Sequence, residues 1–327
     1  MRAPLRRRRA AGLAAAVIAT TLTLVAACSG GEGGSGGTSG PSGSGESSKG
    51  GLFGRDETPT GKELPMGGRT LFPDYRVVGF AGIQGTGPVL GKLGVGALDD
   101  RMQEVVEIGK PYAAGVNKVL PVAEFIATVV HGTPGKDGMY RGRATDEAVQ
   151  KHLDAVRKVN GYLLLAIQPG RSDFVTETKY YEKFLKEPDV GVALDPEWRM
   201  GPGEIPMRVF GHVTGKELND TAAYLSKLVK DNDLPEKIML YHQLNLSVVR
   251  QAEDLKYHEG LAQMVSVDGI GSPEMKVTTW NAVMRVKPKH VYPGFKLFYM
   301  EDAEFGPIME PQAMLDLVPE PFYVLYE

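Results

Sequence analysis

The acidic residues Asp195 and Glu197 stand almost side by side in the stretch DVGVALDPEWRMG, residues 189–201. They follow a short apolar run, and only Pro196 separates them. Two neighbouring carboxyl groups can share acid and base catalysis, because one can hold a proton while the other is ionised. They can also act as oxygen ligands of a divalent cation. Either chemistry requires a fold that turns both side chains toward the same space.

A β-strand over residues 190–198 would provide that arrangement, because successive side chains of a strand point to opposite faces. Three bulky aliphatic residues share one face, whereas Asp195 and Glu197 share the other face with small residues. We expect the aliphatic face to pack against helices and the smaller residues to line an interior. The same alternation turns Gln168 inward at the end of the run 161–168.

Seven further β-rich runs alternate with helical segments from about residue 70 onward. The eight runs are 75–82, 121–130, 161–168, 190–198, 237–243, 262–271, 295–302 and 321–327. Helices are predicted over 145–160 with Thr145 as N-cap, over 214–232 and over 246–260. This alternation predicts a single (β/α)₈ barrel over residues 52–327, with a doubly wound open sheet as the alternative. The eighth run ends the chain, so we expect residues 52–74 to cover the groove of the missing eighth helix.

The carboxyl ends of the strands form one rim of such a barrel, and barrel enzymes keep their active sites there. The polar residues predicted to reach this rim are Gln168, Asp195, Glu197, either His242 or Gln243, Asp268, and either Glu301 or Asp302. Strand ends are often polar without a function, but a pocket of acids, a histidine and amides is the simplest common cause. Arg171 could pair with an anionic group or form a surface salt bridge. Trp198 and Tyr299 could stack on sugar rings or only pack.

An acid after the fourth strand and another after the seventh resemble the large superfamily of retaining (β/α)₈ glycosidases. The resemblance implies that Glu197 is the acid/base and Glu301 the nucleophile. Asp195 with Glu197, or Glu197 with Asp268, are alternative pairs. The sequence departs from the family at Pro196, because those enzymes usually have an asparagine there that holds the sugar 2-hydroxyl group.

Two other functions fit the same residues. Asp195, Glu197, His242 and Asp268 could converge on a divalent metal that activates water, although no HxH or HExxH motif is present. A barrel of this kind could also bind a glycan or peptide without catalysis. The glycine-rich stretch 79–94 matches neither nucleotide-binding motif, so no cofactor is predicted. The net charge of −3 gives no reason to expect nucleic-acid binding.

The first 27 residues have the pattern of a signal peptide, with the basic stretch MRAPLRRRR followed by an apolar segment. The sequence LVAAC that ends at Cys28 resembles a bacterial lipobox, which implies cleavage before Cys28 and lipidation of its thiol. Residues 28–51 then form a flexible Gly/Ser tether on the outer face of the cytoplasmic membrane. Cys28 is the only cysteine, so the folded domain has no internal disulfide.

A set of short motifs from the predicted strand ends is similar to those of a wider group of proteins. The motifs are LDPEW, YHQ, DGIG and GFKLFYMED. Together they resemble bacterial, often actinobacterial, lipoproteins over residues 75–327. This resemblance implies a location and a barrel, and it implies no particular activity.

Overall fold

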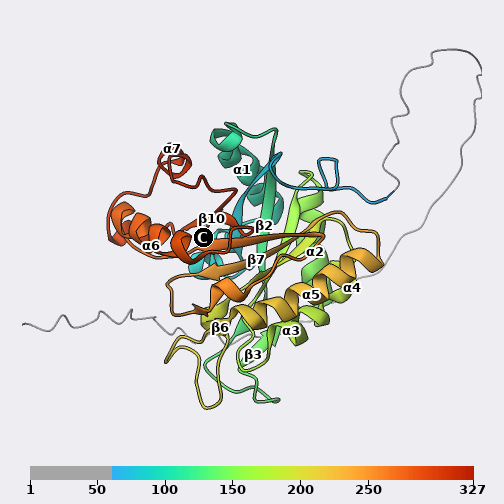
Figure 1. Ribbon diagram of the computed structural model, residues 1–327, viewed down its shortest axis with the longest axis vertical. Coiled ribbons are helices and arrows are strands. Elements are labelled where there is room, and N and C mark those ends of the chain that lie inside the picture. The colour runs from blue at the N-terminus through green and yellow to red at the C-terminus, as the bar shows by residue number, and fades with distance from the viewer. Residues whose placement is uncertain (1–60) are drawn as a thin grey trace, which may run out of the picture. The chain divides into compact units, whose positions relative to one another are not determined.

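The computed structural model describes residues 61–327, which form a closed barrel of eight parallel strands (Figure 1). The strands, in barrel order, are β1 (Tyr75–Gly82), β2 (Lys118–Val130), β4 (Tyr162–Ile167), β5 (Val190–Leu194), β7 (Lys237–Gln243), β9 (Leu261–Val267), β10 (Tyr292–Leu297) and β11 (Tyr323–Tyr326). β1 pairs with both β2 and β11, so the sheet closes on itself. The predicted (β/α)₈ barrel is confirmed, and the open-sheet alternative is wrong.

Helices surround this barrel, with α2 to α5 on one side in Figure 1 and α6 and α7 on the other. They are α1 (Leu98–Gly109), α2 (Asp146–Arg157), α3 (Phe174–Tyr180), α4 (Glu182–Leu185), α5 (Gly215–Asp231), α6 (Pro273–Val286) and α7 (Pro311–Leu315). The side chain of Thr145 accepts a hydrogen bond from the backbone N–H of Ala148, as predicted for an N-cap. Thr214 caps α5 in the same way.

The helix predicted over 246–260 is wrong. This segment contains the two-residue strand β8 (Val249–Arg250), which pairs with β6 (Val213–Thr214), and the short 3-10 helix η5 (Ala252–Asp254). Its apolar residues Val248, Ala252 and Leu255 have helical spacing and are buried. The periodic pattern therefore predicted the buried residues correctly but not the helix. The segment instead packs against the start of α5, where Asn219 hydrogen-bonds to Lys256 and Asp254.

Strand alternation separates the interior of the barrel from the layer between barrel and helices. Leu164, Ala166 and Ala193 belong to the interior cluster, which confirms their predicted direction. The aliphatic residues of β5 belong to the outer cluster, together with Leu163 and Leu165 of β4. Small residues make room for large interior side chains, because a Cβ on Gly191 would lie 3.0 Å from the ring of Tyr162.

Residues 61–72 close the amino end of the barrel. Leu64 and Leu71 join the interior cluster, and the backbone N–H of Leu71 donates to Glu236 at 2.7 Å. The expectation that this region fills the place of the eighth helix is therefore wrong for the described residues. Beside β11 that place is taken by Tyr112 of η3 (Lys110–Ala113), whose hydroxyl group hydrogen-bonds to that of Tyr326.

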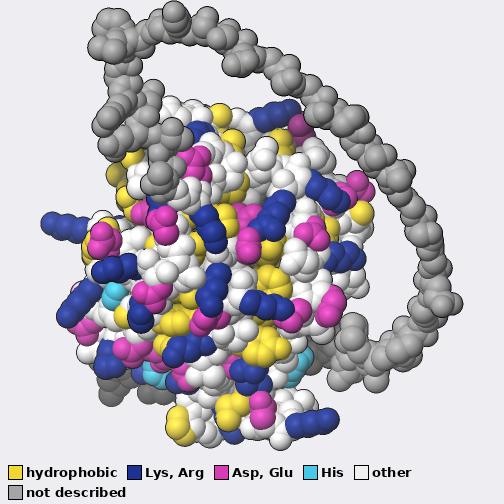
Figure 2. Space-filling view, turned by 90° about the vertical axis from the view of Figure 1, so that its right-hand side faces the viewer, with side chains coloured by type: hydrophobic (Ala, Val, Ile, Leu, Met, Phe, Trp, Pro, Cys, Tyr) yellow, Lys and Arg dark blue, Asp and Glu magenta, His cyan; other side chains and the backbone are white. Residues whose placement is uncertain are grey.

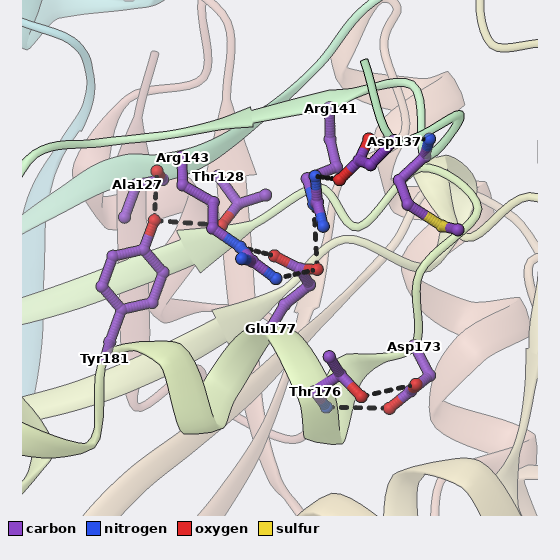
Figure 3. Close-up of polar contacts among 10 residues, drawn as sticks. Ala127, Thr128, Asp137, Arg141, Arg143, Asp173, Thr176, Glu177 and Tyr181 are labelled. Carbon is purple, nitrogen blue, oxygen red and sulfur yellow. Dashed lines mark hydrogen bonds and ion pairs between the residues drawn. The ribbon is translucent and has the colours of Figure 1, made fainter. Parts of the chain in front are cut away.

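A short hairpin extends from the carboxyl end of β2 and is held by a buried carboxylate (Figure 3). Its second strand, β3 (Arg141–Arg143), carries two arginines that both bind Glu177 of α3. Arg143 donates to both carboxylate oxygens over 2.7 and 2.8 Å, and Arg141 donates over 2.9 Å. Burial alone would raise the pKa of Glu177, but the hydrogen bonds from Arg143, Ser172 and Arg141 outweigh burial and lower it.

The outer surface over α2, α4 and α5 mixes both signs of charge (Figure 2). Exposed pairs such as Lys227 with Asp231 account for part of this pattern. Within residues 61–327, no helix is long and apolar enough to cross a membrane. The predicted signal peptide (1–27), the lipidated Cys28 and the tether (28–51) lie outside the described residues.

Candidate active site

Charged and polar side chains fill the inside of the barrel near the carboxyl ends of its strands. They come from six strands or from the residue that follows a strand. The members of this inner polar layer are Glu124 of β2, Asp195 after β5, His242 of β7, Ser266 of β9, Asp268 after β9, Lys296 of β10, and Tyr323 and Glu327 of β11 and its end. The amino half of the barrel interior is apolar, so polar chemistry is confined to the rim predicted for it.

His242 lies at the centre of the inner polar layer and is almost fully buried. Its Nδ1 atom donates to Asp268 over 2.6 Å. Its Nε2 atom lies 3.1 Å from Glu124 and 3.6 Å from Asp195. Burial alone would lower the pKa of His242, but the charges of Asp268 and Glu124 raise it well above the usual value. The imidazole is therefore protonated and bridges carboxylates of three strands.

Lys296 is the second cation of the layer, and its ammonium group is also buried. It lies 2.5 Å from a carboxylate oxygen of Glu327 and 3.6 Å from Asp268. Burial alone would lower the pKa of Lys296, but these two carboxylates raise it well above the usual value. Asp268 also accepts a hydrogen bond from Ser266 over 2.7 Å. Lys296 is thus a fixed positive charge and not a neutral amine nucleophile.

Glu124 and Asp268 are held in the ionised form by their neighbours. Burial alone would raise the pKa of Glu124, but the charge and hydrogen bond of His242 lower it. The hydroxyl group of Tyr323 also donates to Glu124 over 2.6 Å. For Asp268, the charges of His242 and Lys296 likewise outweigh burial and lower the pKa. These two carboxylates form the stable negative part of the layer.

Asp195 and Glu197 differ from these ionised acids. Asp195 is buried, and desolvation raises its pKa to about 7 although the charges of His242 and Lys296 oppose the shift. Glu197 lies in the short 3-10 helix η4 (Pro196–Trp198) and is partly exposed. Burial, together with the charge of Asp195, raises its pKa to about 8. Its Oε2 atom is shielded from solvent and has no hydrogen-bond partner among the described residues.

These four acids divide into an ionised pair and a pair that titrates near neutral pH. Glu197 keeps its proton longest and retains access to solvent, so it can donate a proton to a ligand. Asp195 loses its proton first because His242 lies beside it. Near pH 7 to 8 the site therefore presents one acid and one carboxylate, which is the combination required for acid–base catalysis.

Two residues predicted at the end of the seventh strand do not join the layer. The sequence interpretation extends that strand over 295–302, but β10 ends at Leu297, and the chain then turns away. Glu301 is exposed, and within residues 61–327 no hydrogen bond or ion pair links its side chain to the layer. Asp302 is buried but pairs with Lys276 at 2.9 Å, and it accepts a backbone hydrogen bond from Gly271. Asp302 therefore joins two loops.

Two of the predicted ligand-binding residues hold the structure in place instead. The side-chain oxygen of Gln168 accepts from the backbone N–H of Val130, which fixes the end of β2. Arg171 donates to the backbone carbonyl group of Glu204 over 2.8 and 3.0 Å, and its guanidinium group stacks on Tyr140. Arg171 thus positions the loop after β5.

The remaining predicted residues lie in different places. Trp198 packs edge-on against Phe210 next to Glu197. Gln243 is buried at the end of β7, and its side-chain nitrogen has no partner in the described part of the chain. Tyr299 stacks on Tyr326 in the outer layer, away from the barrel interior.

Sequence reasoning missed Glu124, Lys296, Tyr323 and Glu327. Glu124 is the only acid in the apolar run 121–130, and it shares an inward face with Val122 and Ile126. That alternation predicts an inward direction for Glu124, but it does not show that Glu124 lies level with the ends of other strands. Lys296 was missed because the seventh strand was predicted to end at residue 302, whereas β10 ends at Leu297. One residue of difference in the reading of a strand changes which side chain faces inward.

The metal alternative does not fit the donor atoms. His242 uses Nδ1 for Asp268 over 2.6 Å, and its Nε2 atom lies 3.1 Å from Glu124 and 3.6 Å from Asp195, so both ring nitrogens face carboxylates of the layer. Within residues 61–327, no group of three or more histidine, cysteine or acidic residues is arranged to hold a metal ion. Lys296 already supplies positive charge beside Asp268.

No protein-family model matches the sequence, and no curated protein matches it. Among solved structures, the chain is similar to phospho-2-dehydro-3-deoxyheptonate aldolase (DAHP synthase) from Thermotoga maritima. That similarity has a TM-score of 0.33 and 10% sequence identity, and it covers 68% of this chain and 61% of that chain. The match spans less than two thirds of the aldolase, and neither residues nor activity are carried over from it.

Proposed function

We propose that this protein is a hydrolase that cleaves a glycosidic bond with Glu197 as the general acid and Asp195 as the partner carboxylate. The observation that carries the proposal is the pair of raised pKa values, about 7 for Asp195 and about 8 for Glu197, beside Glu124 and Asp268, whose pKa values are lowered. Glycoside hydrolysis needs one carboxyl group that protonates the leaving oxygen and one carboxylate that acts as nucleophile or base.

The neighbours of the pair support this division of roles. His242 stabilises the ionised form of Asp195, whereas Glu197 experiences the charge of Asp195 and holds its proton more tightly. The resemblance to retaining glycosidases assigns the acid to the same residue, Glu197. It assigns the nucleophile to Glu301, but the exposed position of that residue favours Asp195 instead.

The sequence of residues 1–51 supports a location for this activity. A signal peptide, lipidation of Cys28 and a Gly/Ser tether would hold the barrel on the outer face of the cytoplasmic membrane. The substrates would then be carbohydrates of the cell envelope or the surroundings. The barrel itself needs no cofactor for this reaction.

The test is a screen of envelope and plant glycans and of synthetic glycosides. We expect Glu197→Gln and Asp195→Asn each to lower kcat/KM by roughly 10²- to 10⁴-fold. Glu304→Gln changes an exposed carboxylate of the rim and should retain activity. The wild-type rate should be highest between about pH 7 and 8, because Asp195 must be ionised and Glu197 protonated.

Three results would contradict the proposal. Turnover that is unchanged in Glu197→Gln would remove its role as acid. Loss of turnover in Glu301→Gln, with activity retained in Asp195→Asn, would return the nucleophile to Glu301. Glycan binding without turnover in the wild-type protein would indicate a binding protein instead of a hydrolase.

A further inference from the structure

The loop that follows β5 presents apolar side chains to solvent directly beside the candidate acid. Met207, Val209 and Phe210 are 46%, 48% and 49% exposed. Single exposed apolar residues are common on protein surfaces, but three within four positions next to a site are not explained by chance exposure. Their position relative to Glu197 is defined by hydrogen bonds and ring contacts.

Glu197 and this loop are in direct contact. The backbone N–H of Gly211 donates to the carbonyl oxygen of Glu197 over 2.6 Å, and that of His212 donates to Arg199 over 3.1 Å. The ring of Phe210 packs edge-on against Trp198, with centroids 6.2 Å apart. Trp198, next to the acid, is therefore in contact with the exposed ring of Phe210.

The loop is also held in one conformation. Arg171 donates two hydrogen bonds to the carbonyl oxygen of Glu204, and the carboxylate of Glu204 accepts from the backbone of Gly201. Met207 has a backbone φ of 68°, which is unfavourable for a residue with a side chain and persists only when its surroundings impose it. A surface fixed before binding loses little conformational entropy when a ligand covers it.

We propose that Trp198, Met207, Val209 and Phe210 form an apolar wall that binds the leaving group of the substrate, so that the bond cleaved joins a sugar to an alkyl or aryl group. The inference rests on the proposed function, because Glu197 is taken to protonate the oxygen of that bond. The group that departs must then lie beside Glu197, which is followed in the chain by Trp198, and Trp198 packs against Phe210. Val209 and Met207 precede Phe210 in the same loop and are exposed. A purely polar leaving group would leave the wall in contact with water.

The experiment compares methyl, butyl and hexyl glycosides of glucose, galactose, mannose and N-acetylglucosamine. These leaving alcohols have similar acidity, so a change along the series reports contact and not chemical reactivity. We expect kcat/KM to rise roughly twofold for each added methylene, because burial of a whole methylene is worth about fourfold and the wall covers only one side. The rise should level off when the chain extends past the wall.

Variants separate the wall from general effects of surface polarity. Phe210→Ser and Val209→Ser should abolish the dependence on chain length, so that within each variant kcat/KM for the hexyl glycosides falls to about that for the methyl glycosides. Val318→Ser serves as the matched control, because Val318 is 83% exposed and lies just before β11, at the amino end of the barrel. Thermal unfolding of each variant checks that the fold is retained.

A binding measurement keeps this test independent of catalysis. Affinity of Glu197→Gln for the hexyl and methyl glycosides is followed by the fluorescence of Trp198. Tighter binding of the hexyl compounds that is lost in Phe210→Ser supports the wall even if the wild type shows no turnover, which would contradict the proposed function alone. Turnover that is insensitive to chain length would overturn the wall alone. A dimer that Phe210→Ser converts to a monomer would also overturn it, because a second copy would then cover these side chains.

Discussion

Glu177 is a buried glutamate and Glu197 is a partly exposed one with one shielded carboxylate oxygen, and their surroundings shift their pKa values in opposite directions. Glu177 lies on α3 outside the barrel and receives hydrogen bonds from Arg141 and Arg143 (Figure 3). Glu197 lies above the inner polar layer, and its Oε2 atom has no partner among the described residues. The first carboxylate is ionised by its partners, and the second is kept protonated by desolvation and by Asp195.

The difference shows how burial of an acid serves structure in one place and chemistry in another. A buried carboxylate with two guanidinium partners ties a hairpin to a helix and has no proton to donate. A carboxyl group without a partner costs stability when it ionises, but it keeps a proton available near neutral pH. Partners therefore distinguish the two carboxyl groups better than burial does.

The largest expected effect is on stability at the hairpin. Glu177→Ala leaves Arg141 and Arg143 without their shared partner, and Arg141 is itself largely buried. Removal of one member of a buried ion pair typically costs about 3–5 kcal/mol. Denaturation in urea should show this loss in the free energy of unfolding, with Glu304→Ala as an exposed control. A loss below about 1 kcal/mol would show that the arginines find other partners.

A smaller effect of the opposite sign is expected for Glu197→Gln. The pKa of Glu197 is raised in the folded protein, so its contribution to stability is complete in acid and is lost as the pH rises from about 4.5 to about 8. The free energy of unfolding of the variant should match that of the wild type near pH 4 and exceed it near pH 9 by on the order of 2 kcal/mol. This is less than the full value of about 1.4 kcal/mol per pKa unit, because Glu197 is partly exposed and solvent screens its charge.

Glu177→Gln tests the dependence of stability on pH for a glutamate whose pKa is lowered, and not raised, by folding. The pKa of Glu177 is lowered on folding, so its contribution is present above the unfolded pKa and disappears as the pH falls through the folded value. The stability lost by Glu177→Gln should therefore be greatest near neutral pH and shrink in acid. Between pH 3 and 9, the difference in free energy of unfolding between variant and wild type should rise with pH for Glu197→Gln and fall with pH for Glu177→Gln. The same pH dependence for both variants would contradict the distinction between the two glutamates.

The smallest effect is expected at the edge of the hairpin. Asp137 pairs with Arg141 but is half exposed, and solvent screens such pairs. Asp137→Ala should change the free energy of unfolding by less than about 1 kcal/mol. A cost comparable to that of Glu177→Ala would mean that Asp137, and not Glu177, anchors Arg141.

The strands that alternate most clearly were predicted best. β1 and β7 have the predicted bounds, and the inward direction of Asp195 follows from the aliphatic residues of β5. His242, Asp268 and Asp195 converge because parallel strands of a closed barrel end on one rim. Local alternation and a common topology were sufficient for these residues.

The missed residues depend on information that a local pattern does not contain. Glu124 lies in the middle of the 13-residue β2, and only the register with β1, where it pairs with Ala81, places it level with the end of a neighbouring strand. Lys296 requires the true end of β10, which the aromatic run after it conceals. The irregular segment after β7 has helical periodicity but is held by tertiary contacts with α5.

The most direct test of the account is a titration of the Glu197 side-chain carboxyl group by ¹³C NMR, with Glu197→Gln used to assign its signal. We expect a midpoint near pH 8, well above that of an exposed glutamate, and a lower midpoint in Asp195→Asn because the charge of Asp195 is removed. A midpoint near 4.5 would contradict the assignment of Glu197 as a proton donor at neutral pH.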